Sequence, residues 1–222
     1  YAPLTQEERN EGFSTNPIFA GDRIVGAPNG ADYGGAPGKI HSVGLEDGEL
    51  LWTFDIVPMS PDDPAYATWT NPPSWEAGIG GASAWNAGAY DPVSNTVLYG
   101  TGQPTPWDRV DERRADPDGD VSSDLYSASW VALDADTGEI RWYHQVVPGD
   151  EWDMDQHTVP MFTTLDYEGE ERRVALMATT SRYVLVVDAM TGEMLEAHQG
   201  AEEVTVHLGY DDEFNPIISE DA

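Results

Sequence analysis

The sequence predicts an all-β protein, because three stretches of the 222-residue chain share one hairpin pattern. Each has a short apolar run, an Asp-containing turn that ends in Gly, and a second apolar run: VGLEDGELLW (43–52), VALDADTGEIRW (131–142) and LVVDAMTGEMLE (185–196). An Asp side chain caps such a turn and Gly adopts the positive φ that it requires, so two antiparallel strands flank each turn. Amphipathic helical periodicity is nearly absent.

A fourth, weaker unit, GAYDPVSNTVLYGTG (88–102), follows the same pattern with Asp-Pro and Ser-Asn in its turn. With this unit included, the turn glycines Gly48, Gly138 and Gly192 indicate repeats of roughly 45 to 50 residues. Short-stranded units of this length are typical of β-propeller blades, which are four-stranded antiparallel sheets packed face to face around an axis. We expect a single, partial propeller domain over residues 1–222 with about four to five repeat units.

Two segments, 57–79 and 103–124, do not fit the repeat because they are rich in Pro, Gly and Asp. Both are expected to form long loops rather than regular strands. They carry Trp69, Trp75 and Trp107, and long structured loops on a rigid scaffold are where binding sites are built.

The composition restricts the possible partners. The chain has 41 acidic residues against 10 basic ones, of which only Lys39 is a lysine, and a formal net charge of -31. This charge argues against nucleic acid and anionic membranes as partners and favours cations. A dense shell of carboxylates that needs counter-ions predicts a halophilic protein. With 40% hydrophobic residues, eight Trp and ten Tyr, the chain can still bury a core.

The sequence says little about cellular targeting or about the redox compartment. No window approaches the roughly 18 apolar residues of a membrane span, so none is expected in this chain. The first residue is Tyr1 rather than Met, so we expect a processed or truncated product. Because the chain has no Cys, disulfides and thiolate metal sites are excluded within it.

Two long stretches carry an ordered series of motifs: GGASAWNAGAYDPVSNTVLYGTGQPTPWD (80–108) and SASWVALDADTGEIRWYHQVVPGDEWDMD (127–155). This series resembles the quinoprotein alcohol dehydrogenases, which depend on pyrroloquinoline quinone (PQQ) and are related to methanol dehydrogenase. The resemblance implies an eight-bladed propeller with PQQ and a metal ion on its axis, of which this chain would form about half a ring. The expected partner is the remainder of the propeller or a complementary chain.

The resemblance also assigns candidate cofactor residues. The indole that stacks on the quinone falls on Trp85, and the small residues before it, including Ser83, would let a planar cofactor approach. The catalytic aspartate falls on Asp153, which follows a Trp as in the family. The cation that reaches the quinone oxygens falls at Thr180, where only the neighbouring Arg182 could substitute.

The resemblance implies a metal site that holds Ca²⁺ or a lanthanide. Its ligands would be Asp32, Gln103, Asp153 and Asp155. Asp32 stands where the family has the longer Glu, and Gln103 stands where it has the shorter Asn. Either the ion lies closer to Asp32 than in the family, or the site no longer binds a metal. On an extended strand Asp153 and Asp155 would share a face and repel unless a cation lay between them. His157 is expected to be a hydrogen-bonding neighbour, since hard cations prefer oxygen ligands.

The resemblance implies a quinoprotein alcohol dehydrogenase, or a fragment of one, that oxidises a small alcohol to an aldehyde. Asp153 would accept the hydroxyl proton while hydride passes to PQQ, with the metal as Lewis acid and an external electron acceptor. An extracytoplasmic location, periplasmic, pseudoperiplasmic or secreted, is expected. The alternative is a non-catalytic propeller that serves cell-surface assembly or binds a cation or ligand, and quinone binding distinguishes the two.

Overall fold

The computed structural model describes residues 16–28, 37–69, 71, 73–74, 78–106, 122–201 and 206–219. Asp32, Trp75 and Trp107 therefore lie outside the described residues. Within the described residues, no helix is long and apolar enough to cross a membrane.

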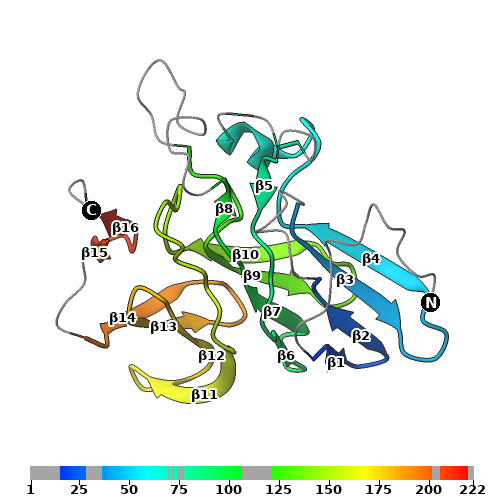
Figure 1. Ribbon diagram of the computed structural model, residues 1–222. Coiled ribbons are helices and arrows are strands. Elements are labelled where there is room, and N and C mark those ends of the chain that lie inside the picture. The colour runs from blue at the N-terminus through cyan, green and yellow to red at the C-terminus, as the bar shows by residue number, and fades with distance from the viewer. Residues whose placement is uncertain are drawn as a thin grey trace.

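Three four-stranded antiparallel sheets stand side by side in a row, which confirms the predicted all-β class and propeller architecture (Figure 1). The first sheet pairs β1 (Ile18–Ala20), β2 (Arg23–Gly26), β3 (Lys39–Gly44) and β4 (Leu50–Asp55). The second pairs β6 (Ala89–Asp91), β7 (Thr96–Gly100), β9 (Ser129–Asp134) and β10 (Ile140–Gln145). The third pairs β11 (Met161–Tyr167), β12 (Glu170–Ala178), β13 (Tyr183–Asp188) and β14 (Met194–Gln199).

Smaller elements complete the described fold. A two-stranded sheet of β15 (His207–Tyr210) and β16 (Pro216–Ile218) follows the third sheet. Another pairs β5 (Gly80–Gly81) with β8 (Pro104–Thr105), and a short 3-10 helix, η2 (Pro64–Thr68), lies in the first long loop. The first strands of neighbouring sheets contact one another, β1 with β6 and β6 with β11, as expected for strands that surround an axis.

The three predicted hairpins are confirmed. They form β3–β4, β9–β10 and β13–β14, and their turn glycines Gly48, Gly138 and Gly192 have φ values of 71°, 74° and 79°. Each glycine N–H donates to the carbonyl four residues earlier, at 2.8 to 2.9 Å. The three turns therefore share one geometry, as their common sequence pattern indicates.

The weaker unit 88–102 forms the predicted hairpin, β6–β7, but it is not a repeat of its own. Strand β7 pairs with β9, so this hairpin lies in the same sheet as residues 131–142. The long segment between β7 and β9 separates the two halves of one sheet in sequence. That insertion made one sheet look like two units.

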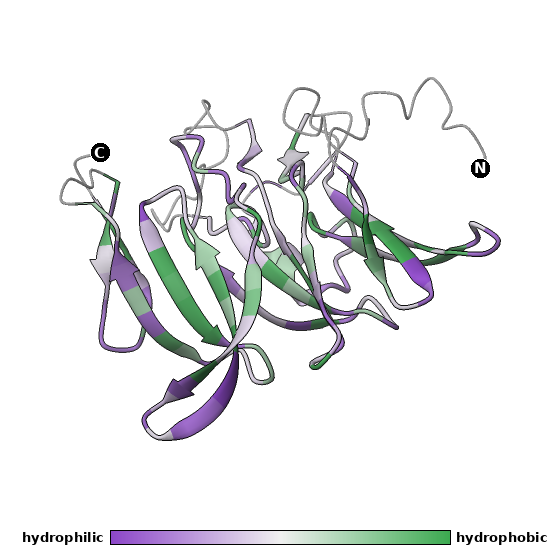
Figure 2. Cartoon of the chain, turned by 90° about the horizontal axis from the view of Figure 1, so that it is seen from below, coloured by the Kyte–Doolittle hydropathy of each residue, from purple (hydrophilic) through white to green (hydrophobic). Residues whose placement is uncertain are grey.

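The middle sheet is buried on both faces, because neighbouring sheets cover it on either side. Along β7 and β9 the side chains alternate: Val97 and Val131 pack in the cluster shared with the first sheet, whereas Leu98 and Ala132 pack in the cluster shared with the third. Figure 2 shows these green, apolar strands at the centre and purple, hydrophilic residues along the β11–β12 hairpin. The continuous apolar runs of the middle sheet follow from this double burial.

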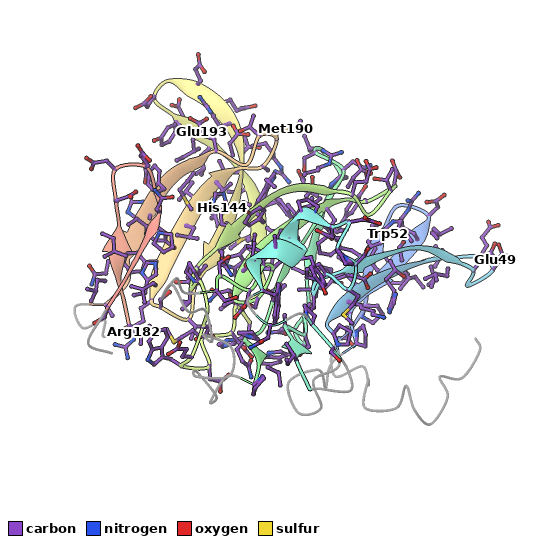
Figure 3. The ribbon with its side chains drawn as sticks, turned by 90° about the horizontal axis from the view of Figure 1, so that it is seen from above. Glu49, Trp52, His144, Arg182, Met190 and Glu193 are labelled. Atoms are coloured by element: carbon purple, nitrogen blue, oxygen red, sulfur yellow. The ribbon has the colours of Figure 1, made fainter. Side chains whose placement is uncertain are left out.

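Tryptophans join successive sheets through one repeated contact. Trp52 of β4 lies against the turn of the second sheet, and its Nε1 donates to the Ala135 carbonyl at 3.0 Å (Figure 3). Trp142 of β10 lies in the same way against the turn of the third sheet, with its Nε1 3.4 Å from the Ala189 carbonyl. A Cβ on Gly138 or on Gly192 would lie 2.5 to 2.6 Å from these indoles, so the contact requires glycine.

Ion pairs also cross the gaps between sheets. Arg173 of β12 donates through Nε to Asp91 of β6 at 3.1 Å, and the Asp91 side chain is fully buried. Burial alone would raise the pKa of Asp91, but hydrogen bonds from Arg173 and Ser94 outweigh it and lower that pKa. A buried carboxylate in this acidic protein is thus stabilised in its charged form by an arginine of the next sheet.

Candidate functional site

Three loop segments that are far apart in sequence meet at one end of the second sheet. The β5–β8 pairing places Gly81 opposite Pro104 and so brings the GGASAW segment beside the GTGQP segment. Backbone hydrogen bonds then tie the segments together: Ala82 N–H to the Gln103 carbonyl, Gly102 N–H to the Ser83 carbonyl, and Gln156 N–H to the Thr101 carbonyl, at 2.8 to 3.0 Å. The last of these bonds adds the DMDQH segment to the site.

The glycines of GTGQP make this close approach possible. A Cβ on Gly100 would lie 1.9 Å from the Gln156 carbonyl oxygen, a distance that no side chain can accommodate. A Cβ on Gly102 would lie 3.0 Å from the Asp155 Oδ1. Gly100 therefore requires glycine for a reason of packing, whereas a side chain at Gly102 would push the Asp155 carboxylate away from the loop by a few tenths of an ångström.

Asp155 is the residue on which the segments converge. Its Oδ2 accepts a hydrogen bond from the Trp85 Nε1 at 2.5 Å, and its Oδ1 accepts one from the Gln103 backbone N–H at 2.7 Å. The Thr180 hydroxyl donates to the Asp155 backbone carbonyl. The structure thus brings together Trp85, Gln103 and Asp155, three residues that the sequence assigned to one site.

The pKa of Asp155 is raised. Burial of its carboxyl group is the main cause, and the negative charge of Asp153 adds to it, while hydrogen bonds from Trp85 and Gln103 act in the opposite direction. The cost of burying this negative charge is relieved in one of two ways: a proton neutralises the carboxyl group, or a bound cation compensates the charge of the carboxylate.

Asp153 does not lie on an extended strand, so the prediction that it shares a strand face with Asp155 is wrong. Residues 151–160 form no strand, and Asp153 has a left-handed φ of 62° with an exposed side chain. The cause is Asp150, whose buried carboxylate accepts hydrogen bonds from the backbone N–H groups of Trp152 and Met154 at 2.9 and 2.6 Å. Those bonds turn the chain just before the site.

His157 is closer to the centre of the site than its sequence position suggests. Its imidazole stacks on the indole of Trp85, with ring centroids 5.4 Å apart and an interplanar angle of 13°. Its Nδ1 lies 3.1 Å from the Asp155 carbonyl oxygen and 3.3 Å from the Thr180 hydroxyl. The sequence expectation of a hydrogen-bonding neighbour is met, but nothing in the sequence indicates the ring stacking.

The remaining candidates differ in burial. Ser83 is fully buried, and its carbonyl accepts the Gly102 N–H. Arg182 lies in the turn before β13, with a φ of 68° and an exposed side chain (Figure 3). The hydroxyl of Thr180, in the same turn, contacts the backbone of Asp155.

The oxygen donors of the site suit a hard cation. Gln103 is 5% exposed, and its Oε1 is buried with no hydrogen-bond partner among the described residues. An orphaned amide oxygen and a carboxylate oxygen are both ligands that Ca²⁺ or a lanthanide accepts, and Asp155 is tied to Gln103 through the backbone N–H of the latter. Asp32 lies outside the described residues, and within them no group of three or more His, Cys, Asp or Glu could hold a metal.

Comparisons with known proteins identify the family of the chain. Residues 3–204 match the family model "PQQ: Glucose/ethanol/alcohol dehydrogenase, beta-propeller domain". The quinohemoprotein alcohol dehydrogenase of Comamonas testosteroni is 35% identical over 211 residues, which are 90% of this chain and 28% of that protein.

Solved structures give the same result. The quinohemoprotein alcohol dehydrogenase ADHIIG of Pseudomonas putida HK5 superposes with a TM-score of 0.85 at 28% identity, over 98% of this chain and 32% of that one. A europium-containing methanol dehydrogenase shares the fold, with a TM-score of 0.78 at 22% identity over 94% of this chain and 37% of that one. This chain spans less than a third of the Comamonas and Pseudomonas proteins. It belongs to the PQQ-dependent alcohol dehydrogenase family, of whose β-propeller domain it forms a part.

Proposed function

We propose that this chain is part of a dehydrogenase that oxidises a small alcohol to an aldehyde with PQQ and passes the electrons to an external acceptor. The observation that carries the proposal is the hydrogen bond of Trp85 to Asp155, because it joins a flat indole to a partly buried carboxylate at 2.5 Å. Family membership supports the same reaction class.

Each candidate residue has a role in this proposal. Trp85 offers a ring face to a planar cofactor, the small Ser83 lets that cofactor approach, and Arg182 supplies a cation for the quinone oxygens in place of the uncharged Thr180. Asp155, Gln103, Asp153 and Asp32 are the ligands for Ca²⁺ or a lanthanide. When bound, PQQ supplies a two-electron acceptor that no side chain provides, and the metal supplies a Lewis acid.

Asp153 is the proposed general base. Its side chain is exposed and has room to meet an alcohol, whereas Asp155 is held by two hydrogen bonds. Asp153 accepts the proton of the substrate hydroxyl as the carbon gives up its hydride. The buried Asp150 positions Asp153 by holding the loop in front of it.

The proposal also includes the setting. The net charge of -31 with a single lysine fits an extracytoplasmic protein of a saline environment, periplasmic, pseudoperiplasmic or secreted. In that setting PQQ and a hard cation are taken up from outside the cytoplasm.

The test is reconstitution of the complete protein that contains this chain with PQQ and either Ca²⁺ or La³⁺. We expect a bound-quinone absorption band and dye-linked alcohol oxidation. Asp153→Asn should lower the turnover rate at least about 1,000-fold and leave the quinone band in place. Asn tolerates the left-handed φ of this position, so the variant should fold. Asp212→Asn, on an exposed turn, is the matched control.

The alternative function, a non-catalytic propeller for assembly or ligand binding at the cell surface, is favoured by one observation. His157 already stacks on one face of Trp85, so that face is not free for a quinone. Absence of a quinone band with every metal tested, in a protein shown to be folded, would establish this alternative over the dehydrogenase.

A further inference from the structure

The indole of Trp85 and the imidazole of His157 face each other almost in parallel. Their ring centroids lie 5.4 Å apart with an interplanar angle of 13°, which is within the range of offset-stacked aromatic rings. Trp142 and His144 also approach each other, at 5.7 Å, but their ring planes are tilted by 54°. Proximity alone therefore does not make an indole and an imidazole parallel.

Two hydrogen bonds join the segments that carry the stacked rings. The Trp85 Nε1 donates to the Asp155 Oδ2 at 2.5 Å, and the side-chain amide of Asn86 donates to the His157 backbone carbonyl. Two consecutive residues of the GGASAW segment and its neighbour are thus tied to alternate residues of the DMDQH segment. Asp155 holds the indole at its edge, and His157 covers one of its faces.

The imidazole of His157 is itself held by groups other than Trp85. Its Nδ1 lies 3.1 Å from the Asp155 carbonyl oxygen and 3.3 Å from the Thr180 hydroxyl. Because a carbonyl oxygen can only accept, Nδ1 donates to it. The plane of the imidazole is therefore set independently of the indole that it covers.

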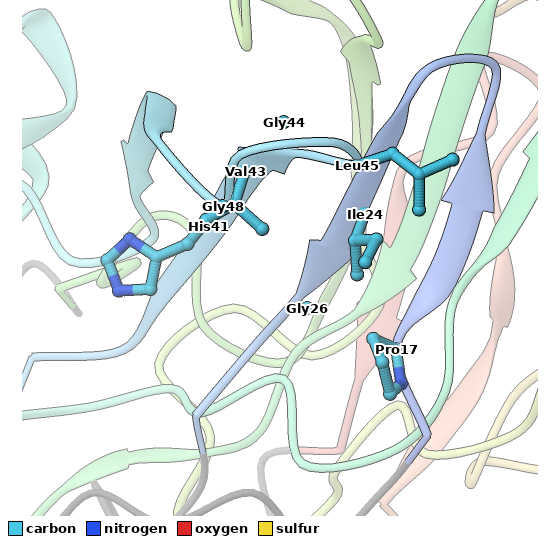
Figure 4. Close-up of a pocket in the computed structure, with 8 residues that line it drawn as sticks. All are labelled: Pro17, Ile24, Gly26, His41, Val43, Gly44, Leu45 and Gly48. Atoms are coloured by element: carbon cyan, nitrogen blue, oxygen red, sulfur yellow. The ribbon is translucent and has the colours of Figure 1, made fainter. Parts of the chain in front are cut away.

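A planar ligand that stacks on Trp85 has to use the ring face opposite His157, because the imidazole covers the other one. The cavity of about 360 Å³ in the first sheet is not this position (Figure 4). Ile24, His41 and the other residues that line it are not candidate site residues.

We propose that His157 is a positioning residue, which supports the indole of Trp85 from one side and so holds the opposite ring face in place for a planar ligand. The stacking of the rings supplies this support, whereas the hydrogen bond of Nδ1 orients the imidazole. That the planar ligand is PQQ rests on the proposed function. That His157 fixes the indole does not.

Three substitutions in the complete protein that contains this chain separate the stacking from the hydrogen bond. His157→Ala removes both, His157→Phe keeps a ring without the donor, and His157→Asn keeps a donor without the ring. His157 is only partly buried, so all three variants should fold. His198→Ala, which removes an exposed histidine, is the matched control.

The first measurement needs no cofactor. Exchange of the Trp85 indole N–H with deuterium is followed by NMR in protein with ¹⁵N-labelled tryptophan, and its resonance is the one that Trp85→Phe lacks. An indole without support opens its hydrogen bond to Asp155 more often. We expect exchange to be about tenfold faster in His157→Ala and His157→Asn, and within about threefold of the unmodified protein in His157→Phe and His198→Ala.

The second measurement is the dissociation constant of PQQ in the presence of Ca²⁺, by equilibrium dialysis. It should rise about tenfold in His157→Ala and His157→Asn and stay nearly unchanged in His157→Phe and His198→Ala. An unmodified protein that binds no PQQ would contradict the proposed function, and the exchange rates would then decide the role of His157 by themselves.

Three results would overturn the inference. Equal exchange rates in all variants would mean that the indole needs no support from His157. If His157→Asn behaved like the unmodified protein and His157→Phe did not, the hydrogen bond rather than the stacking would supply the support. Tighter binding of PQQ to His157→Ala would mean that the imidazole occupies the face that the cofactor uses.

Discussion

His207 is a buried histidine whose surroundings are aromatic. Its ring packs edge to face against Tyr210 and Tyr183, at centroid distances of 4.6 and 5.0 Å, and it is 1% exposed. Within the described part of the chain, neither ring nitrogen has a hydrogen-bond partner in another residue. Burial lowers the pKa of His207 to about 4, so the ring is neutral in the folded protein at physiological pH.

The sign of the resulting pH dependence follows from that lowered pKa. As pH falls below the ordinary value of about 6.5, the unfolded chain takes up a proton on His207 that the folded chain refuses until about pH 4. Stability is therefore lost between these values. His207→Phe should reduce the loss of unfolding free energy between pH 7 and 4.5 by about 2 kcal/mol, measured by urea unfolding at constant salt.

The exposed His198 provides the control. His198→Gln removes an exposed histidine and leaves His207 in place. It should therefore leave the loss of unfolding free energy between pH 7 and 4.5 nearly unchanged. If His207→Phe retained the full pH dependence of the unmodified chain, the buried ring would not be the source of that dependence.

At the same scale, the sequence predicted which residues meet but not how. Trp85, Gln103 and Asp155 were placed in one site through a resemblance of motifs, and the Asp155 carboxylate does accept hydrogen bonds from the Trp85 indole and the Gln103 backbone N–H. The predicted conformation of Asp153 was wrong because the spacing of two residues between Asp153 and Asp155 was interpreted as that of an extended strand. The two hydrogen bonds of the buried Asp150 decide the local path, and no periodicity in the sequence reports them.

At the scale of elements, the turn glycines offer a matched pair. Gly48 and Gly138 have nearly the same positive φ, so alanine costs each of them about 1 kcal/mol of backbone strain. At Gly138 the new Cβ would also lie 2.6 Å from the ring of Trp52 and displace it. Gly138→Ala should therefore lower the unfolding free energy by about 3 kcal/mol, against about 1 for Gly48→Ala, in urea titrations.

Equal losses of unfolding free energy for Gly138→Ala and Gly48→Ala would mean that the Trp52 indole moves aside at no energetic cost.

The hairpins could be predicted because their determinants are local. Asp, Gly and two apolar runs lie within about twelve residues, and all three strong units fold as expected. The assignment of β6–β7 to its sheet was missed because β7 pairs with β9 across a long insertion. A pairing across such a distance has no signature in the hairpin sequences themselves.

At the scale of the whole molecule, net charge opposes compaction. A charge of -31 on 222 residues repels itself, and the ten basic residues offset little of it although arginines such as Arg23 and Arg173 bridge adjacent sheets. Salt should therefore stabilise the chain. Raising KCl from about 0.1 M to about 1 M, which shortens the Debye length from about 10 to 3 Å, should raise the midpoint of thermal unfolding by on the order of 5 °C or more.

Scanning calorimetry at several KCl concentrations gives this midpoint, with sucrose as the uncharged control. Sucrose should stabilise the chain through exclusion from its surface without the steep rise at low concentration that screening produces. A midpoint that falls with KCl would show that ion pairs between sheets outweigh the repulsion.

The contact of a tryptophan with the glycine turn of the next sheet gives the row of sheets a direction. At both joints between the three described sheets, the tryptophan comes from the earlier sheet and the turn from the later one. Sheets joined in this way can follow one another in one direction only, because each joint needs a tryptophan on the earlier sheet and a glycine turn on the later one.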